Sequence, residues 1–156
     1  MAIAVYPGSF DPFTYGHLDI ATRAAKMFET VHIVVVHNPA KDPRLTTTQR
    51  VELITEILKS KPGSFVVSSL DTGLLVDYCK SLGADALVKG VRTNVDLDYE
   101  LPMAQVNRDL SGIETIFIPA DPTHGFVSSS LVKQVFDLGG DISKYVPAEV
   151  VKALSN

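Results

Sequence analysis

Side chains suited to binding phosphate stand out in a loop near the start of this sequence. Within residues 7–17, Gly8 lets the backbone approach a ligand, Ser9 offers a hydroxyl group, and His17 stands at the start of a predicted helix. Backbone N–H groups are free at a helix N-terminus and the helix dipole is positive there, which favours phosphate. A histidine at that point can donate a hydrogen bond to phosphate oxygens as charge shifts among them. The alternative is that the prolines and glycines only shape a long turn and that His17 caps the helix.

Cationic side chains mark two further loops. Lys41 lies between two prolines, which hold the chain extended and can aim the lysine toward a ligand, although a single loop lysine is more often simply solvated. Lys89 and Arg92 flank Gly90. Two cations so placed suit an anion, although one of them can equally be a surface charge.

A fourth loop ends in three serines at residues 128–130, which open a predicted helix with Lys133 one turn further on. Hydroxyls and free backbone N–H groups together form another candidate anion site. A helix cap, however, needs only one serine. Each of the four loops therefore has an ordinary explanation when it is taken alone.

The elements around these loops place them together. Apolar runs predict strands at residues 2–6, 31–36, 64–70, 84–89 and 114–118, and helical spacing predicts helices at 16–28, 46–58, 73–82, 95–110, 128–138 and 146–154. This alternation predicts a Rossmann-like α/β fold, a doubly wound five-stranded parallel sheet with helices on both faces, in a single domain over residues 1–156. Pro102 is expected to kink its helix or delay its start. Ligands bind beyond the carboxyl ends of such strands, so four phosphate-binding loops at one edge predict one site.

Composition limits the class of protein. Of 156 residues, 46% are apolar and 21% charged, which is typical of a globular chain. The net charge of −4 argues against a broad nucleic-acid surface. The apolar runs are too short for a membrane span, and the first residues do not resemble a signal peptide. The single cysteine, Cys79, lies in an apolar pattern that predicts a buried thiol. We therefore expect a cytoplasmic protein that binds neither nucleic acid nor membrane.

The motifs resemble those of a known family. G-x-G-x-x-G and G-x-x-x-x-G-K-[ST] do not occur, and no histidine or cysteine cluster has metal-ligand spacing. Residues 7–12 with 14–17 (PGSFDP, TYGH) and residues 127–133 (VSSSLVK) are instead similar to the two signatures of the nucleotidyltransferase superfamily. Within it, the chain resembles the bacterial phosphopantetheine adenylyltransferases along essentially its whole length, also matching at NPAK (38–41), KGVRT (89–93) and DYE (98–100).

This resemblance implies a reaction. ATP and 4′-phosphopantetheine would give dephospho-CoA and pyrophosphate, the penultimate step of coenzyme A synthesis. The acceptor phosphate would attack the α-phosphorus of ATP directly, and Mg²⁺ carried by the ATP phosphates would help. Catalysis would then rest on positioning and on stabilisation of charge. The resemblance also implies CoA as a feedback ligand and a homohexamer, built as a dimer of trimers.

The resemblance also implies roles for particular residues. The catalytic residues would be His17, Lys41 and Arg92, with His17 stabilising the transition state at the α-phosphate. The acceptor would be bound by Ser9, Lys41, Leu75 and Lys89, with Leu75 near the pantetheine arm. ATP would be bound by Ser9, Phe10, His17, Gly90, Val91, Arg92, Glu100, His124, Gly125, Phe126, Val127, Ser128, Ser129 and Ser130. No residue is implied as a metal ligand.

The chain departs from the family pattern at three positions. Thr14 replaces the first histidine of the superfamily's His-x-Gly-His, as is usual for this branch. Lys89 stands where many members have arginine, which keeps the charge but loses a bidentate fork. Pro102 lies in a helix that resembles a subunit contact in the family.

Two alternatives remain open at this point. A sister nucleotidyltransferase would use another phosphate acceptor, and a non-catalytic protein would bind ATP or CoA only as a sensor. His32 and His37, at the two ends of the second predicted strand, are interpreted as structural.

Overall fold

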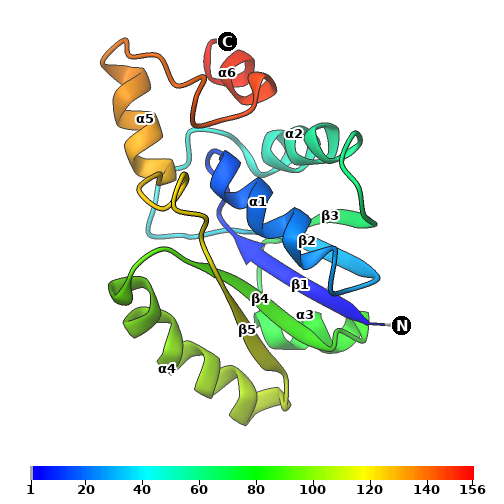
Figure 1. Ribbon diagram of the computed structural model, residues 1–156. Helices are drawn as coiled ribbons and strands as arrows, with labels where there is room; N and C mark the ends of the chain where they lie inside the picture. The colour runs from blue at the N-terminus through cyan, green and yellow to red at the C-terminus, as the bar shows by residue number, and fades with distance from the viewer. Residues whose placement is uncertain (1) are drawn as a thin grey trace.

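A computed structural model describes residues 2–156 as a single α/β domain around one five-stranded parallel sheet (Figure 1). The strands are β1 (Ile3–Gly8), β2 (Thr30–Val36), β3 (Phe65–Leu70), β4 (Ala86–Val91) and β5 (Glu114–Pro119). The helices are α1 (Tyr15–Ala24), α2 (Thr47–Leu58), α3 (Leu75–Leu82), α4 (Asn94–Ser111), α5 (Ser129–Asp137) and α6 (Ala148–Leu154). The fold class predicted from the sequence is therefore confirmed.

Most helix ends lie within two residues of the prediction, and the end of α1 differs most. α1 ends at Ala24 instead of continuing to residue 28, because the chain tightens there and the Lys26 N–H bonds to the Arg23 carbonyl three residues back. α4 begins at Asn94, where the Thr93 hydroxyl caps it. Pro102 lies inside α4, so it does not delay the start of this helix.

The strand order reverses beside β1. The sheet order is β3-β2-β1-β4-β5, so the chain builds outward from β1 on one side and then crosses to β4 on the other. β1 pairs with β2 along its whole length, from Ile3 to Gly8. It pairs with β4 only at Ala4 and Val5. β1 and β4 therefore separate toward their carboxyl ends, which opens a crevice at the position where this class of sheet binds ligands.

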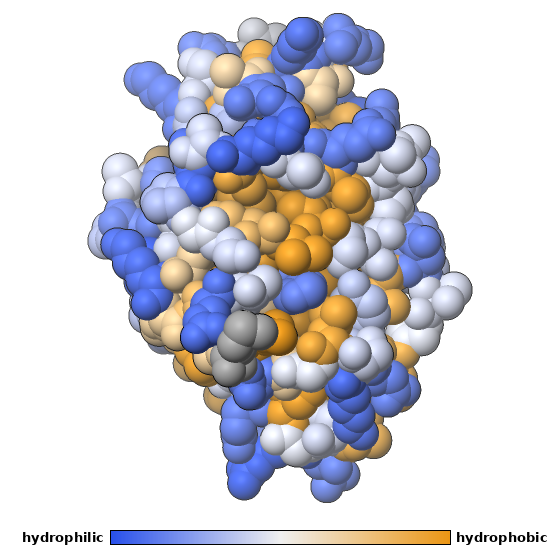
Figure 2. Space-filling view, turned by 90° about the vertical axis from the view of Figure 1, so that its right-hand side faces the viewer, coloured by the Kyte–Doolittle hydropathy of each residue, from blue (hydrophilic) through white to orange (hydrophobic). Residues whose placement is uncertain are grey.

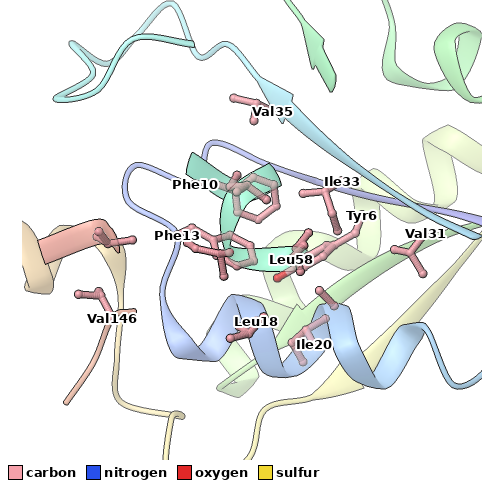
Figure 3. Packing of buried hydrophobic residues seen from close by; sticks show 14 of the residues in the cluster. Tyr6, Phe10, Phe13, Leu18, Ile20, Val31, Ile33, Val35, Leu58 and Val146 are labelled. Atoms are coloured by element: carbon pink, nitrogen blue, oxygen red, sulfur yellow. The ribbon is translucent and has the colours of Figure 1, made fainter. Parts of the chain in front are cut away.

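Apolar side chains cover both faces of the sheet. The larger cluster joins alternate residues of β1 and β2 to α1, α2, α5 and α6, and Figure 3 shows Phe10 and Phe13 of the β1–α1 loop packed within it. The smaller cluster lies on the other face and includes Val5, Leu87 and Cys79 of α3. Cys79 is buried as predicted, and burial raises the pKa of its thiol to about 11. The β1–α1 loop is thus anchored to the larger core cluster by Phe10 and Phe13.

The edge of the sheet at which the strands begin has an apolar surface area. Figure 2 looks at the side from which the N-terminus emerges and shows apolar atoms surrounded by hydrophilic side chains. Two apolar side chains near these strand starts, Met27 and Val66, are 53% and 43% exposed. Within residues 2–156, no helix has the length and apolar character needed to cross a membrane. The polar loops of interest gather at the opposite edge, beyond the carboxyl ends of the strands.

Candidate active site

A cleft of about 510 Å³ lies at the point where the strand order reverses. Its walls come from the carboxyl ends of β1 and β4, the start of α1, one side of α4 and the segment between β5 and α5. The lining residues are Tyr6, Pro7, Gly8, Phe10, Thr14, Gly16, His17, Ile20, Lys89, Gly90, Arg92, Val95, Asp96, Tyr99, Glu100, Ala120, His124, Val127, Ser128, Ser129 and Ser130. Three of the four predicted phosphate-binding loops therefore contribute to one concave site of a size typical for a small ligand.

His17 both caps α1 and faces the cleft. Thr14 is the N-cap of the helix, and its hydroxyl accepts a hydrogen bond from the His17 backbone N–H at 3.3 Å. In return, the Thr14 backbone N–H donates to Nδ1 of His17 at 3.0 Å, which completes a capping box. Because Nδ1 accepts this bond, the ring proton is on Nε2. The two interpretations of His17 that the sequence left open are therefore compatible.

The surroundings of His17 keep its ring neutral. The ring stacks on Phe13, with centroids 5.6 Å apart, and meets Phe10 edge-on at 5.1 Å. Burial, and secondarily the positive charge of Arg92, lower the pKa of His17 from 6.5 to about 4. At neutral pH the imidazole is thus an uncharged donor with a fixed tautomer and a fixed plane. Such a group can bind phosphate oxygens without reorganising.

Two cations of the cleft are held by carboxylates of one helix. Lys89 Nζ lies 3.2 Å from Glu100, and Arg92 Nε lies 3.3 Å from Asp96. Asp96 and Glu100 are four residues apart on α4, so they share one face of the helix. The Arg92 guanidinium also donates to the Val127 carbonyl at 3.1 Å. Both cations are therefore positioned at the cleft in advance of a ligand.

Two glycines of the site have steric reasons to be glycine. A Cβ at Gly90 would lie 3.0 Å from Cγ1 of Ile20, because α1 packs closely on β4. A Cβ at Gly8 would lie 2.8 Å from the Phe10 ring. The sequence interpretation of Gly8 was an approach to a ligand, and the structure shows that this glycine first makes room for an aromatic side chain that lines the cleft.

The three serines of the α5 start have different partners. Ser128 is the N-cap and accepts from the Leu131 N–H, so the simple helix-cap interpretation holds for this residue. The Ser129 hydroxyl donates to the Pro12 carbonyl at 2.8 Å and ties α5 to the β1–α1 loop. Ser129 and Ser130 line the cleft and also a smaller cavity beside it. Ser129 and Ser130 therefore lie between the main cleft and the smaller cavity.

The smaller cavity contains two of the predicted acceptor residues. It has a volume of about 50 Å³, and its lining residues are Ser9, Asp11, His37, Asn38, Lys41, Pro43, Arg50, Ser129, Ser130 and Lys133. Ser9 and Lys41 therefore do not line the main cleft with His17 but stand in the cavity next to it. His37, interpreted as structural, also lines this cavity, whereas His32 lies within β2.

Four predicted residues line neither space. Leu75 packs against the smaller core cluster below the sheet. Val91 and Gly125 are neighbours of lining residues, and Phe126 is 63% exposed with its ring edge-on to Tyr145. Conversely, Asp11 and Asp96 contact the cations Lys133 and Arg92, but neither is among the predicted catalytic or binding residues. Asp96 follows Arg92 at helical spacing, which was a usable signal, whereas the contact of Asp11 with Lys133 crosses most of the chain.

Comparison with known proteins relates this chain to a family. Residues 5–135 match a family model described as cytidylyltransferase-like. A protein of Clavibacter michiganensis subsp. michiganensis named phosphopantetheine adenylyltransferase is 53% identical over 155 residues, covering 98% of this chain and 95% of that one. A protein of the same name from Bifidobacterium longum is 50% identical, covering 100% and 94%.

Solved structures share the same architecture. The Plasmodium falciparum nicotinic acid mononucleotide adenylyltransferase complexed with NaAD superposes with a TM-score of 0.69, covering 97% of this chain and 95% of that chain. Its sequence identity is 16%, so this likeness concerns the fold alone.

Proposed function

Because the chain belongs to the phosphopantetheine adenylyltransferase family, we propose that its cleft transfers the adenylyl group of ATP to 4′-phosphopantetheine, giving dephospho-CoA and pyrophosphate. The chain is a nucleotidyltransferase enzyme of coenzyme A synthesis. The observation that carries the proposal is 46–53% identity with relatives of that name over nearly the full chain. The neutral, oriented His17 beside paired cations supports it.

The proposed reaction needs no general base. A phosphate oxygen of 4′-phosphopantetheine forms a bond to the α-phosphorus of ATP, and the bond from that phosphorus to the bridging oxygen of pyrophosphate breaks. The nucleophile is already an anion, so no proton has to leave it. His17 donates its Nε2 proton in a hydrogen bond to an α-phosphate oxygen, on which negative charge rises in the transition state. The hydrogen bond from the Thr14 N–H to Nδ1 keeps this donor aimed.

The two spaces of the site suggest how the substrates are divided. ATP occupies the main cleft, with its phosphates near Arg92 and the start of α5. The acceptor phosphate lies toward Ser9 and Lys41, and the two substrates meet beside Ser129 and Ser130, which line both spaces. Lys41 and Lys89 reduce the repulsion between the two phosphate groups. We keep the proposal that Leu75 contacts the pantetheine arm, although Leu75 does not line the main cleft.

We propose that Mg²⁺ arrives with the ATP phosphates. Within the described residues 2–156, no group of three or more His, Cys, Asp or Glu side chains is placed to hold a metal ion. The two acidic residues that line the cleft, Asp96 and Glu100, are bonded to Arg92 and Lys89. Mg²⁺ often takes phosphate oxygens and water as most of its ligands, so a nucleotide-borne ion fits these residues. When bound, it supplies neutralisation of the phosphate charge.

We also propose the homohexamer that the sequence resemblance implies. No residue of α4 is buried, and most of its large apolar side chains are 42–75% exposed, namely Val95, Tyr99, Leu101, Met103, Val106 and Leu110. So much exposed apolar surface on one helix is typical of a surface that another chain covers. Copies of this chain, arranged as a dimer of trimers, are the proposed cover.

Two further proposals concern ligands and location. CoA is proposed as a feedback ligand, because it contains both the pantetheine arm and the adenosine that the two spaces would bind. We propose that the enzyme acts in the cytoplasm, where ATP is available as the substrate.

A substrate panel tests the proposed function. Pyrophosphate release from ATP is measured with 4′-phosphopantetheine, with nicotinate mononucleotide and with no acceptor. The proposal expects release only with 4′-phosphopantetheine, together with formation of dephospho-CoA. Release only with the nucleotide acceptor would instead identify a sister nucleotidyltransferase. Binding of ATP with no release on any acceptor would contradict the enzyme assignment and favour a sensor.

A further inference from the structure

Asp11 is a nearly buried carboxylate that the proposed reaction does not use. Its exposed fraction is 5%, although it carries a charge. Buried carboxylates without partners are very unfavourable, so its contacts require an explanation. Burial alone would raise the pKa of Asp11, but hydrogen bonds from the backbone of Arg44 and Leu45 and from Lys133 lower it below the ordinary value. Asp11 therefore stays charged among several donors.

These donors come from two segments far from Asp11 in the sequence. The Arg44 N–H donates to Oδ2 at 2.9 Å, and the Leu45 N–H donates to Oδ1 at 2.9 Å. Lys133 Nζ of α5 reaches Oδ2 at 3.1 Å. The Asp11 carboxylate thus joins three parts of the chain. These are the β1–α1 loop, the end of the Lys41 segment (residues 37–46, between β2 and α2) and the first turns of α5.

A buried arginine reinforces the same junction. The side chain of Arg50 is 2% exposed, and it donates to the Ser9 carbonyl at 2.6 Å and to the Leu45 carbonyl at 3.0 Å. Arg50 therefore holds the Ser9 and Leu45 carbonyls, while Asp11 holds the Leu45 N–H. Arg50 and Asp11 both line the small cavity. An exposed contact also exists, in which the Arg44 guanidinium meets Asp137 at 2.8–2.9 Å.

We propose that Asp11 is a positioning residue: it anchors the Lys41 segment and Lys133 around the small cavity, so that the acceptor phosphate is held against the end of the ATP site. This inference rests on the proposed function. Asp11 also lines the small cavity, but both of its carboxylate oxygens accept hydrogen bonds from the protein. Its role is exerted through Lys41, whose segment ends at the two anchored amides, and through Lys133, which lines the cavity.

The variant Asp11→Asn tests the proposal, because it keeps the size of the side chain but places an amide N–H₂ against donors. The expected result is a KM for 4′-phosphopantetheine raised about 10- to 100-fold, from one buried N–H left unpaired, while the KM for ATP changes less than about threefold. Asp137→Asn is the matched control. It removes only the exposed contact of Arg44, so both KM values should stay within about threefold of the native chain.

A second measurement uses the unaltered protein and needs no folded variant. Amide hydrogen exchange reports whether the Arg44 and Leu45 N–H groups are held, and the proposal expects protection close to that of amides inside α2. Exchange as fast as that of exposed loop amides would overturn the anchoring. A folded Asp11→Asn protein with both KM values unchanged, or with both raised equally, would overturn the positioning role. If the native chain instead forms no dephospho-CoA while both amides are protected, the proposed function fails and the anchoring stands.

Discussion

Replacing His17 by glutamine should remove much of the acid sensitivity of this fold. Glutamine suits the third position of a capping box, so the variant retains the contact of this side chain with Thr14 and the start of α1. The native ring has a pKa lowered from 6.5 to about 4 by burial and by Arg92. The unfolded chain releases the ring from that environment. It therefore binds a proton over a pH range in which the folded chain does not.

The sign and size of the effect follow from this difference. Because the folded pKa lies below the unfolded one, the stability linked to His17 is fully present above about pH 6.5 and is lost as the pH falls toward about 4. At 1.36 kcal/mol per pKa unit, the total is about 3 kcal/mol, of which about 2 kcal/mol is lost by about pH 5. This is a large share of the stability of an ordinary domain.

Urea unfolding of the native chain and of His17→Gln, each at about pH 8 and about pH 5, measures this quantity. The native chain should lose about 2 kcal/mol more than the variant between the two pH values. Other acid-sensitive groups, including Asp11 and His32, are present in both proteins and cancel in the comparison. His37→Gln, which removes an exposed histidine, is the control and should behave as the native chain does. Equal losses in the native chain and His17→Gln would refute the buried, neutral ring.

Three other predictions concern packing, charge and assembly. Gly90→Ala should lower the free energy of unfolding by about 1–3 kcal/mol, measured by thermal unfolding, because the new Cβ lies 3.0 Å from Ile20. Gly125→Ala is the control and should lower it less, because the nearest atom to its new Cβ is 3.7 Å away. Equal effects of the two substitutions would contradict the close packing at Gly90. Lys89→Met should raise the KM for 4′-phosphopantetheine by at least about tenfold through loss of a charge-assisted contact, and an unchanged KM would remove Lys89 from the acceptor site. Val106→Glu on the exposed face of α4 should lower the mass measured by light scattering below that of the native assembly, and an identical mass would exclude this part of α4 from the subunit contacts.

The fold was predictable because its signals are local. Apolar runs of a few residues, separated by stretches with helical spacing, place every element within a few residues of its observed bounds. The sequence spacing of Thr46 and Gln49 is that of a capping box, and the structure has this box at the start of α2. Gly83 ends α3 in the left-handed conformation, at φ 66°, as a glycine after a helix predicts. Pro102 shows the limit of such rules, because the helix begins well before it and continues past it.

The sequence predicted which loops form the site, but not that the site is divided into a main cleft and a smaller cavity. The parallel sheet forces the loops after β1, β4 and β5 to meet, so His17, Arg92 and the serines of α5 gather as expected. The sequence did not indicate that Lys41 stands in a separate cavity, because that depends on how its segment is anchored. The anchor, Asp11, contacts Lys133 across 122 positions of the chain, and no spacing rule reaches so far.

The role of His17 is the central claim of this account, and His17→Ala tests it most directly. ATP binding is measured by calorimetry, and dephospho-CoA formation is measured in a single turnover with both substrates saturating. The account predicts ATP binding within about threefold of the native chain and a rate at least ~100-fold lower, because a transition-state donor is lost while the binding cleft remains. A variant that forms dephospho-CoA at a rate close to that of the native chain would contradict it.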